Sequence, residues 1–476
     1  MVFSSIEFIF IFLPIFFLVY YFLPFKFKNI WLFIASLVFY SYGVLDNPLY
    51  ILLLLISILL NYYFGIAISR SEQNRRGWLA AGLAYNFAWL FLFKYSDFVF
   101  ENINAVLGKF FPSWGFELPL SEWVLPIGIS FYTFQICSYI IDVYRKKVPA
   151  EKSILDLGVY ICMFPQLIAG PIVTYSSVAK QLHKRKHTLA LAESGLKEFV
   201  IGLGLKVLLA NQVSTLWSNI EGIGYESIST PLAWMGILAF TFQIYFDFYG
   251  YSLMAIGLGR MMGFKLPKNF DYPYISTSMT EFWRRWHISL GSWFRDYLYI
   301  PLGGNRKGKG RQLLNILLVW LATGLWHGAD WTFVLWGLLY AALLTAEKLF
   351  LLRGLKKLRV LNHIYVLLFV TLGFVLFDAD SVRSAAASVC AMFGGGGLPL
   401  AGQESLYALR SGAVLLLSAA VGATPLPRRL ITAVQQKTAG RAVLAVLEPV
   451  GLCLLLAVCT AFLVDGSFNP FLYFRF

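Results

Sequence analysis

The sequence has little charge for its length. Of its 476 residues only 13% are Asp, Glu, Lys or Arg, while 58% are hydrophobic. A soluble domain typically carries about 25% charged residues, so a water-soluble globular fold of this size is excluded. The hydrophobic residues form long runs without alternation, such as Ile51–Leu60 and Val414–Val421, each interrupted by a single serine. Membrane-spanning helices are therefore expected, and not a β-barrel.

Several common catalytic and metal-binding patterns are missing. The five cysteines show no metal-ligand spacing, and no Cys-x-x-Cys, His-Glu-x-x-His or Gly-x-Ser-x-Gly pattern occurs. Gly303–Gly310 comes near a phosphate-binding loop, but Gly310 stands where Ser or Thr is required and no strand is expected before it. The sequence predicts no metal site and no tightly bound cofactor.

The net charge of +14 would fit a nucleic-acid-binding protein, but the placement of the basic residues favours a membrane protein. Lys and Arg gather in short connectors between the hydrophobic runs. With the N-terminus outside, every basic connector falls on the cytoplasmic side and every acidic or neutral one on the other, as the positive-inside rule requires. We therefore expect the lipid bilayer as a partner and no nucleic acid.

Hydropathy and the positive-inside rule predict about twelve crossings, near residues 5–24, 30–43, 48–69, 78–95, 124–143, 194–218, 231–258, 312–327, 332–351, 360–377, 409–424 and 442–464. Two more hydrophobic segments, 154–172 and 279–300, have basic runs on both sides, so each is re-entrant or buried against other helices. Phe164-Pro165-Gln166 and Gly170-Pro171 break the first of them. The prediction is one all-α, polytopic domain over 1–476, with about 11–12 transmembrane helices plus re-entrant or buried helices.

Ionisable side chains at membrane depth are costly, so they are functional candidates by default. The densest collection is Thr280–Arg306. As one continuous helix it would place Arg284, His287 and Gly291 on a shared face. Two interpretations stay open on the pattern alone: an amphipathic helix lying in the membrane interface, or one wall of a buried polar cavity.

Two other residues stand out in or beside hydrophobic spans. His327 follows the run Leu313–Leu325. It is either a hydrogen-bonded residue at the end of a span or a general base, because neutral imidazole suits that role near neutral pH. Asp247 lies in mid-span and needs a partner, for which the basic residues of 284–306 are the candidates. The alternative for Asp247 is a purely structural ion pair.

The remaining histidines receive no role. His183 and His187 have a spacing that suits a metal, but Lys184, Arg185 and Lys186 lie between them and would repel a cation. We expect a solvated basic loop there. His363 lies near the start of a predicted span.

The motifs together resemble those of the membrane-bound O-acyltransferase (MBOAT) family, and within it the branch of bacterial alginate O-acetylation membrane proteins. The resemblance is densest in a signature core at about 242–340. The matching residues are Phe246–Phe248 with Gly250, Tyr251 and Ser252, then Met261–Phe264, Pro267–Phe270, Glu281–Leu290, Arg295–Arg306, Gly324–Thr332 and the tail Asn469–Phe476.

The resemblance implies an acyltransferase of the bacterial cell membrane that moves an acetyl group from a cytoplasmic donor, acetyl-CoA or another acyl thioester. The acceptor would be a secreted or membrane-anchored acetyltransferase- or esterase-like protein, for O-acetylation of an exported polysaccharide such as alginate or another cell-envelope polymer. The family's two catalytic signature positions match His327 and His287. The stretch Tyr299–Arg306 favours the acetylation branch over the related D-alanylation branch.

Our hypothesis makes His327 the general base for the incoming hydroxyl, or a group that stabilises the acyl-transfer intermediate. His287, Arg295 and Asp296 would orient donor or acceptor, Arg306 would belong to the same binding or supporting set, and Asp247 would hold the basic cluster. Two rival hypotheses remain. One is a transporter or flippase of a lipid-linked envelope precursor, although no pair of related halves is visible. The other is a scaffold for a secreted enzyme.

Overall fold

The computed structural model describes residues 2–121, 123–168, 170–224, 227–395, 397 and 399–466, and all regular structure within these ranges is helical. The all-α expectation is therefore confirmed. The tail Asn469–Phe476, which carries part of the family resemblance, lies outside the described residues.

The chain forms a series of helices joined mostly by short connectors. The N-terminal helices are η1 (Phe8–Phe12), α1 (Leu13–Phe22), α2 (Phe25–Gly43), α3 (Leu49–Arg70), α4 (Arg75–Lys94), α5 (Ser96–Phe110), η2 (Pro112–Trp114), α6 (Ile129–Tyr144), α7 (Ile154–Cys162), α8 (Phe164–Leu167) and α9 (Tyr175–His183). The middle ones are α10 (Leu189–Gly204), η3 (Leu205–Ala210), α11 (Asn211–Glu221), α12 (Thr230–Met261), η4 (Pro273–Ile275), α13 (Met279–Arg285), α14 (Ile288–Phe294) and η5 (Arg295–Tyr299). The C-terminal ones are α15 (Gly308–His327), α16 (Trp331–Ala346), η6 (Glu347–Leu351), α17 (Leu352–Leu355), α18 (Leu361–Asp378), α19 (Val382–Met392), α20 (Gln403–Gly422), α21 (Leu426–Gln435) and α22 (Thr438–Asp465).

Seven of the helical segments in the described part are long and apolar enough to cross a membrane, and each coincides with a predicted crossing. They are Leu49–Arg70, Leu189–Glu221, Thr230–Met261, Trp331–Leu355, Leu361–Asp378, Gln403–Gly422 and Thr438–Asp465. The polytopic membrane architecture is thus confirmed. The other expected crossings, including those at 5–24 and 312–327, fall on shorter or less apolar helices and stay predictions.

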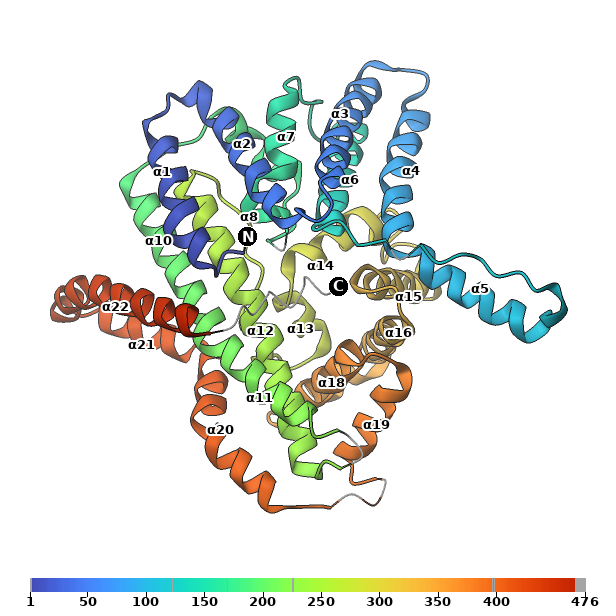
Figure 1. Ribbon diagram of the computed structural model, residues 1–476, viewed down its shortest axis with the longest axis vertical. Coiled ribbons are helices and arrows are strands. Elements are labelled where there is room, and N and C mark those ends of the chain that lie inside the picture. The colour runs from blue at the N-terminus through green and yellow to red at the C-terminus, as the bar shows by residue number, and fades with distance from the viewer. Residues whose placement is uncertain are drawn as a thin grey trace.

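Helix α12 occupies the middle of the bundle (Figure 1), with α10 and α11 along one flank and α18 and α19 near its beginning. Glycines bring α10 and α12 together. A Cβ on Gly202 would lie 2.6 Å from the carbonyl oxygen of Gly250, and one on Gly257 would lie 2.4 Å from that of Gly195. Small residues at both crossing points let the two backbones touch, as is usual between membrane helices. Figure 1 also shows α5 and α22 projecting from opposite sides of the bundle.

The segment 279–300 is not one continuous helix, so the shared face expected for Arg284, His287 and Gly291 is wrong. Helix α13 ends at Arg285, and His287 adopts a left-handed conformation with φ of 43° before α14 begins. The break has a tertiary cause: the Ile288 N–H donates to the carbonyl of Asn269 at 2.9 Å in place of a helical partner. Its side chains Phe282, Leu290 and Trp293 are buried against the rest of the chain, while Arg295 and Ile300 at its end are exposed.

A buried carboxylate fixes the start of α13. Glu347 accepts hydrogen bonds from the backbone N–H groups of Met279 at 2.6 Å and Thr280 at 2.9 Å. A negative charge at a helix N-terminus is favourable because four N–H groups there lack helical partners. In the other non-crossing segment the expected break is confirmed, since α7 ends at Cys162 and the short α8 begins at Phe164.

Candidate active site

His287 is buried and held by a neighbouring asparagine. Its side chain is joined through Nδ1 to Oδ1 of Asn269 at 3.1 Å, and the residue is 2% exposed. The same Oδ1 accepts the Ser289 N–H at 3.2 Å and the Ser289 hydroxyl at 2.9 Å. The Ser289 hydroxyl in turn accepts the N–H of Ile172 at 2.9 Å. The two non-crossing segments, 154–172 and 279–300, therefore meet beside His287.

This network decides the tautomer of His287. A backbone N–H is always a donor, so the Asn269 atom that Ser289 contacts is the carbonyl oxygen. That oxygen accepts hydrogen bonds only, and so Nδ1 of His287 must carry a proton and donate. In the neutral imidazole, Nε2 then presents a lone pair. No described residue forms a hydrogen bond with this nitrogen, which leaves it available as a proton or hydrogen-bond acceptor.

His327 is the last residue of α15 and is also buried, at 4% exposure. The end of its helix is fastened to α4. The Lys94 ammonium donates to the carbonyls of Trp326 at 2.6 Å and His327 at 3.0 Å, and the Tyr95 hydroxyl donates to that of Leu325 at 2.8 Å. These bonds satisfy carbonyls that have no helical partner at a C-terminus.

The two histidines share an aromatic neighbour. The ring centroid of Trp326 lies 6.0 Å from that of His287 and 4.9 Å from that of His327. Phe248 lies edge-on to His287 at 4.6 Å, while Trp336 and Phe377 lie 5.1 and 5.2 Å from His327. Both imidazoles are thus held in one cage of aromatic rings on α12, α15, α16 and α18.

Several buried polar atoms without a hydrogen-bond partner lie in or beside this cage. Among the described residues they include His287 Nε2, Asn269 Nδ2, Trp326 Nε1, Trp336 Nε1 and Tyr340 Oη. Buried polar groups in proteins are almost always hydrogen-bonded. At the cage these atoms offer both donors and acceptors to a polar substrate.

Asp247 does not hold the basic cluster of 284–306, and that expectation is wrong. Its carboxylate is paired with the ammonium of Lys206 in η3, at 2.6 Å, with both side chains buried. The close crossing of α10 and α12 at Gly202 and Gly250 places the two residues opposite each other. The alternative interpretation of Asp247 as a member of a structural ion pair fits this geometry.

Arg295, Asp296 and Arg306 lie apart from the buried cage, because all three are at the surface. Arg295 and Asp296 pair with each other at 2.7 Å, with side chains 60% and 40% exposed. The hydrogen bond from Arg295 to Asp296 raises the pKa of the guanidinium. Arg306 is exposed in the turn before α15. A role for the three in holding donor or acceptor stays a prediction.

His183 and His187 are not simply solvated, contrary to expectation. The ring of His183 lies between two carboxylates, Nε2 at 3.0 Å from Glu151 and Nδ1 at 3.5 Å from Asp156. The donor atoms of these three residues lie within 4.8 Å of one another, a set that fits a divalent cation. His187 contacts Tyr20 Oη at 3.0 Å.

Burial, with added repulsion from Lys28 and Arg185, lowers the pKa of His187 to about 4. The remaining histidine, His363, lies 3.1 Å from the carbonyl of Ser276 through Nδ1. Neither residue belongs to the aromatic cage.

Four residues that support the site went unrecognised in the sequence: Lys94, Lys206, Asn269 and Glu347. Three of them carry a charge inside or at the end of a hydrophobic run, which is a usable signal. Asn269 lies in a connector, and nothing in its local pattern indicates that it holds His287.

Comparison with known proteins places the chain among acyltransferases. A model of the membrane-bound O-acyltransferase family, MBOAT, matches residues 147–377. The chain is 37% identical over 508 residues to the probable alginate O-acetylase AlgI of Azotobacter vinelandii, with 100% of both chains covered. It is 40% identical over 423 residues to the protein of the same name from Pseudomonas aeruginosa, covering 87% of this chain and 80% of that one. The peptidoglycan O-acetyltransferase of Helicobacter pylori is 36% identical over 445 residues, covering 84% of this chain and 81% of that protein.

Proposed function

Because the chain belongs to the membrane-bound O-acyltransferase family, we propose that it passes acetyl groups across the membrane for O-acetylation of an exported polysaccharide. It is a multi-pass membrane O-acyltransferase with bacterial relatives. The proposed donor is acetyl-CoA or another acyl thioester on the cytoplasmic side. The proposed acceptor is a secreted or membrane-anchored acetyltransferase- or esterase-like protein that modifies alginate or another cell-envelope polymer.

The main structural support for acyl transfer is the pair of buried histidines around Trp326. The bond from His287 Nδ1 to Asn269 leaves Nε2 with a free lone pair. His327 lies in the same aromatic cage. An imidazole held in this way is suited to take a proton from a hydroxyl group, because its ordinary pKa lies near neutral pH.

In the proposed transfer step the acetyl group moves from the sulfur of the donor to the hydroxyl oxygen of the acceptor. The acceptor hydroxyl oxygen forms a bond to the acyl carbon of the thioester while its single proton passes to His327. Nε2 of His287 holds the acceptor in place by accepting a hydrogen bond from a different donor group of the same molecule. The carbon–sulfur bond then breaks, and the leaving sulfur takes up the proton held by His327. The products are an O-acetyl ester and a free thiol.

Complementation tests the acceptor class. The chain is expressed in a Pseudomonas aeruginosa strain that lacks its own AlgI, and the acetyl content of the secreted alginate is measured by proton NMR. Restored acetylation supports alginate as the polymer. Membrane-localised protein with no acetylation refutes alginate, and the same expression in a Helicobacter pylori strain without its peptidoglycan O-acetyltransferase then tests the other polymer.

A second experiment separates catalysis from transport. The purified protein is placed in liposomes. Acetyl-CoA that carries a label in its acetyl group is added outside the liposomes, and solubilised membrane-anchored partner proteins are enclosed inside them. Label bound covalently to the enclosed proteins supports acyl transfer. A labelled lipid-linked sugar that crosses the bilayer unchanged, without acyl transfer, would identify a flippase and contradict the proposal.

A further inference from the structure

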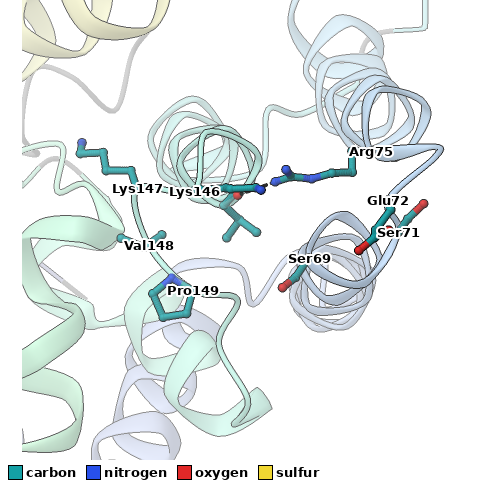
Figure 2. Close-up of a pocket in the computed structure, with 9 residues that line it drawn as sticks. Ser69, Ser71, Glu72, Arg75, Lys146, Lys147, Val148 and Pro149 are labelled. Carbon is teal, nitrogen blue, oxygen red and sulfur yellow. Dashed lines mark hydrogen bonds between the residues drawn. The ribbon is translucent and has the colours of Figure 1, made fainter.

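A polar pocket of about 420 Å³ lies between α3, the start of α4 and the loop that follows α6. Figure 2 shows Arg75 extending into it from α4 and Lys146 from the opposite loop, with Ser69 and Ser71 at one edge. Both connectors that form the pocket belong to the basic runs that the positive-inside rule predicts to face the cytoplasm.

Arg75 is held in place before any ligand arrives. Its Nε donates to the carbonyl of Ile68 at 3.1 Å, and its Nη2 donates to those of Tyr144 at 2.8 Å and Val143 at 3.3 Å. No described residue accepts a hydrogen bond from Nη1. The two N–H groups of Nη1 are left for an anionic oxygen, and the guanidinium keeps its positive charge because arginine is not deprotonated in proteins.

Positive charge is in excess around the pocket. Arg75, Lys146 and Lys147 line it together with one acid, Glu72. Asp142 balances Lys147 at 3.2 Å, but no ion pair in the described part of the chain involves Lys146 or Glu72. Lys146 has φ of 57°, and this left-handed turn directs its side chain into the space shown in Figure 2.

The start of α4 lies beside the pocket, because its first residue, Arg75, is part of the pocket lining. The helix is 20 residues long, begins at Arg75, and receives no side-chain capping bond from Asn74. The first N–H groups of a helix lack helical partners and favour anions. The first residue of the helix therefore lies in the pocket wall beside Lys146 and Lys147, and the positive end of the helix adds to their attraction for an anion.

Helix α6 connects this pocket with the histidine pair. At its pocket end, Asp142 accepts the Tyr297 hydroxyl at 2.9 Å, and Arg145 donates to the Asp296 carbonyl at 3.1 Å. Further along the helix, the Phe134 ring stacks on Trp293 at 3.8 Å and lies 5.7 Å from Trp326. The ten residue-to-residue steps from Phe134 to Tyr144 span about 15 Å at the helical rise.

We propose that this pocket binds a phosphate group. On the function proposed above, that phosphate belongs to the acyl thioester donor. The same chemistry would also bind the phosphate of an anionic lipid headgroup, and the two sources are separated by experiment.

The test uses the full-length protein in nanodiscs of phosphatidylcholine, with calorimetry of two probes, CoA and pantetheine, which lacks the phosphates. We expect the double variant Arg75→Gln, Lys146→Asn to weaken CoA binding at least tenfold and to leave pantetheine binding unchanged. Lys146→Asn is also measured alone, because Asn tolerates the left-handed conformation and this exposed change leaves the bonds of Arg75 intact. The matched control is Lys356→Gln, Lys357→Gln, two exposed lysines of another basic connector.

A parallel experiment tests whether the pocket binds an anionic lipid. It uses nanodiscs that contain phosphatidylglycerol, and the lipid that stays bound to the protein is measured by native mass spectrometry. Loss of retained phosphatidylglycerol in the double variant, with CoA binding unchanged, supports the phosphate site and overturns its assignment to the donor. Unchanged binding of both CoA and phosphatidylglycerol overturns the phosphate site itself. Weakened CoA binding in the pocket variants, together with undiminished acetyl transfer in His327→Ala, would support the phosphate site and refute the proposed catalytic role of His327.

Discussion

The ammonium of Lys94 donates a hydrogen bond to the backbone carbonyl of His327 at 3.0 Å and a second to that of Trp326 at 2.6 Å. Helix α15 ends at His327, so these carbonyls have no helical partners, and a positive charge at a helix C-terminus is favourable. Lys94 therefore fixes the backbone that carries the imidazole. We regard it as a positioning residue for His327.

Replacing Lys94 by Met removes both hydrogen bonds while keeping much of the side-chain volume. Because small displacements of a reacting group can cost about 100-fold in rate, we expect kcat to fall by about 10- to 100-fold with KM for the donor nearly unchanged. Lys94→Arg should recover part of the loss. Steady-state acetyl-transfer kinetics test this, with Lys109→Met, an exposed lysine of α5, as the control. A wild-type kcat in Lys94→Met would contradict the positioning role.

Lys206→Met leaves Asp247 without the buried ammonium that it contacts at 2.6 Å. Losing one member of a buried ion pair costs about 3–5 kcal/mol, so we expect a clear fall in Tm for the purified protein. The double variant Lys206→Met, Asp247→Leu should recover most of that stability and should retain acetyl transfer, which is the result that we expect of a structural pair. A stable but inactive double variant would instead place Asp247 in substrate binding.

Asn269→Ala removes the oxygen that accepts the proton of His287 Nδ1. The ring is then free to turn or to change tautomer, and we expect the rate of acetyl transfer to fall about tenfold or more. Asn269→Asp keeps an acceptor oxygen at the same position and should retain more activity than the Ala variant. Initial rates of acetyl transfer are measured at matched protein levels to test whether Asn269 holds His287, and Tm is measured to check that each variant folds. Equal activity in Asn269→Ala and the wild type would rule out the holding role.

His187 gives the folded protein a dependence on pH. Its pKa is lowered to about 4 in the fold, against an ordinary value of about 6.5. Between these values the unfolded chain binds a proton that the folded chain does not, so the stabilising contribution is complete above pH 6.5 and is lost as the pH falls toward 4. The Tm of the wild type should therefore drop more between pH 7 and pH 5 than that of His187→Gln. An equal or smaller drop in the wild type would refute this.

The sequence predicts the membrane architecture well because hydropathy and loop charge act locally along the chain. All seven long apolar helices coincide with expected crossings, and the break near Pro165 follows from proline chemistry. The continuous helix over 279–300 is wrong for a nonlocal reason. Asn269, 18 residues before His287, binds the backbone of Ile288 and imposes the left-handed turn. Periodicity carries no information about such a contact.

In the candidate active site, too, some features follow from the sequence and others depend on contacts that only the folded chain makes. His287 and His327 are identified through the family resemblance, and the structure brings both to Trp326. The partner of Asp247 is mispredicted, because the choice between Lys206 and the basic cluster depends on how α10 crosses α12. Lys94 is a charge at the end of a hydrophobic run, but only the folded chain places it against the end of α15. The extent of the single domain, 1–476, stays a prediction.

Whether His327 takes part in acyl transfer is tested by the initial rate of labelled acetyl transfer by His327→Ala in proteoliposomes. The rate is compared with those of the wild type and of His363→Gln, at equal amounts of folded protein. General base catalysis contributes about 10²–10⁴-fold, so we predict a fall of at least about 100-fold for His327→Ala and no change for His363→Gln. A wild-type rate in His327→Ala would contradict the account.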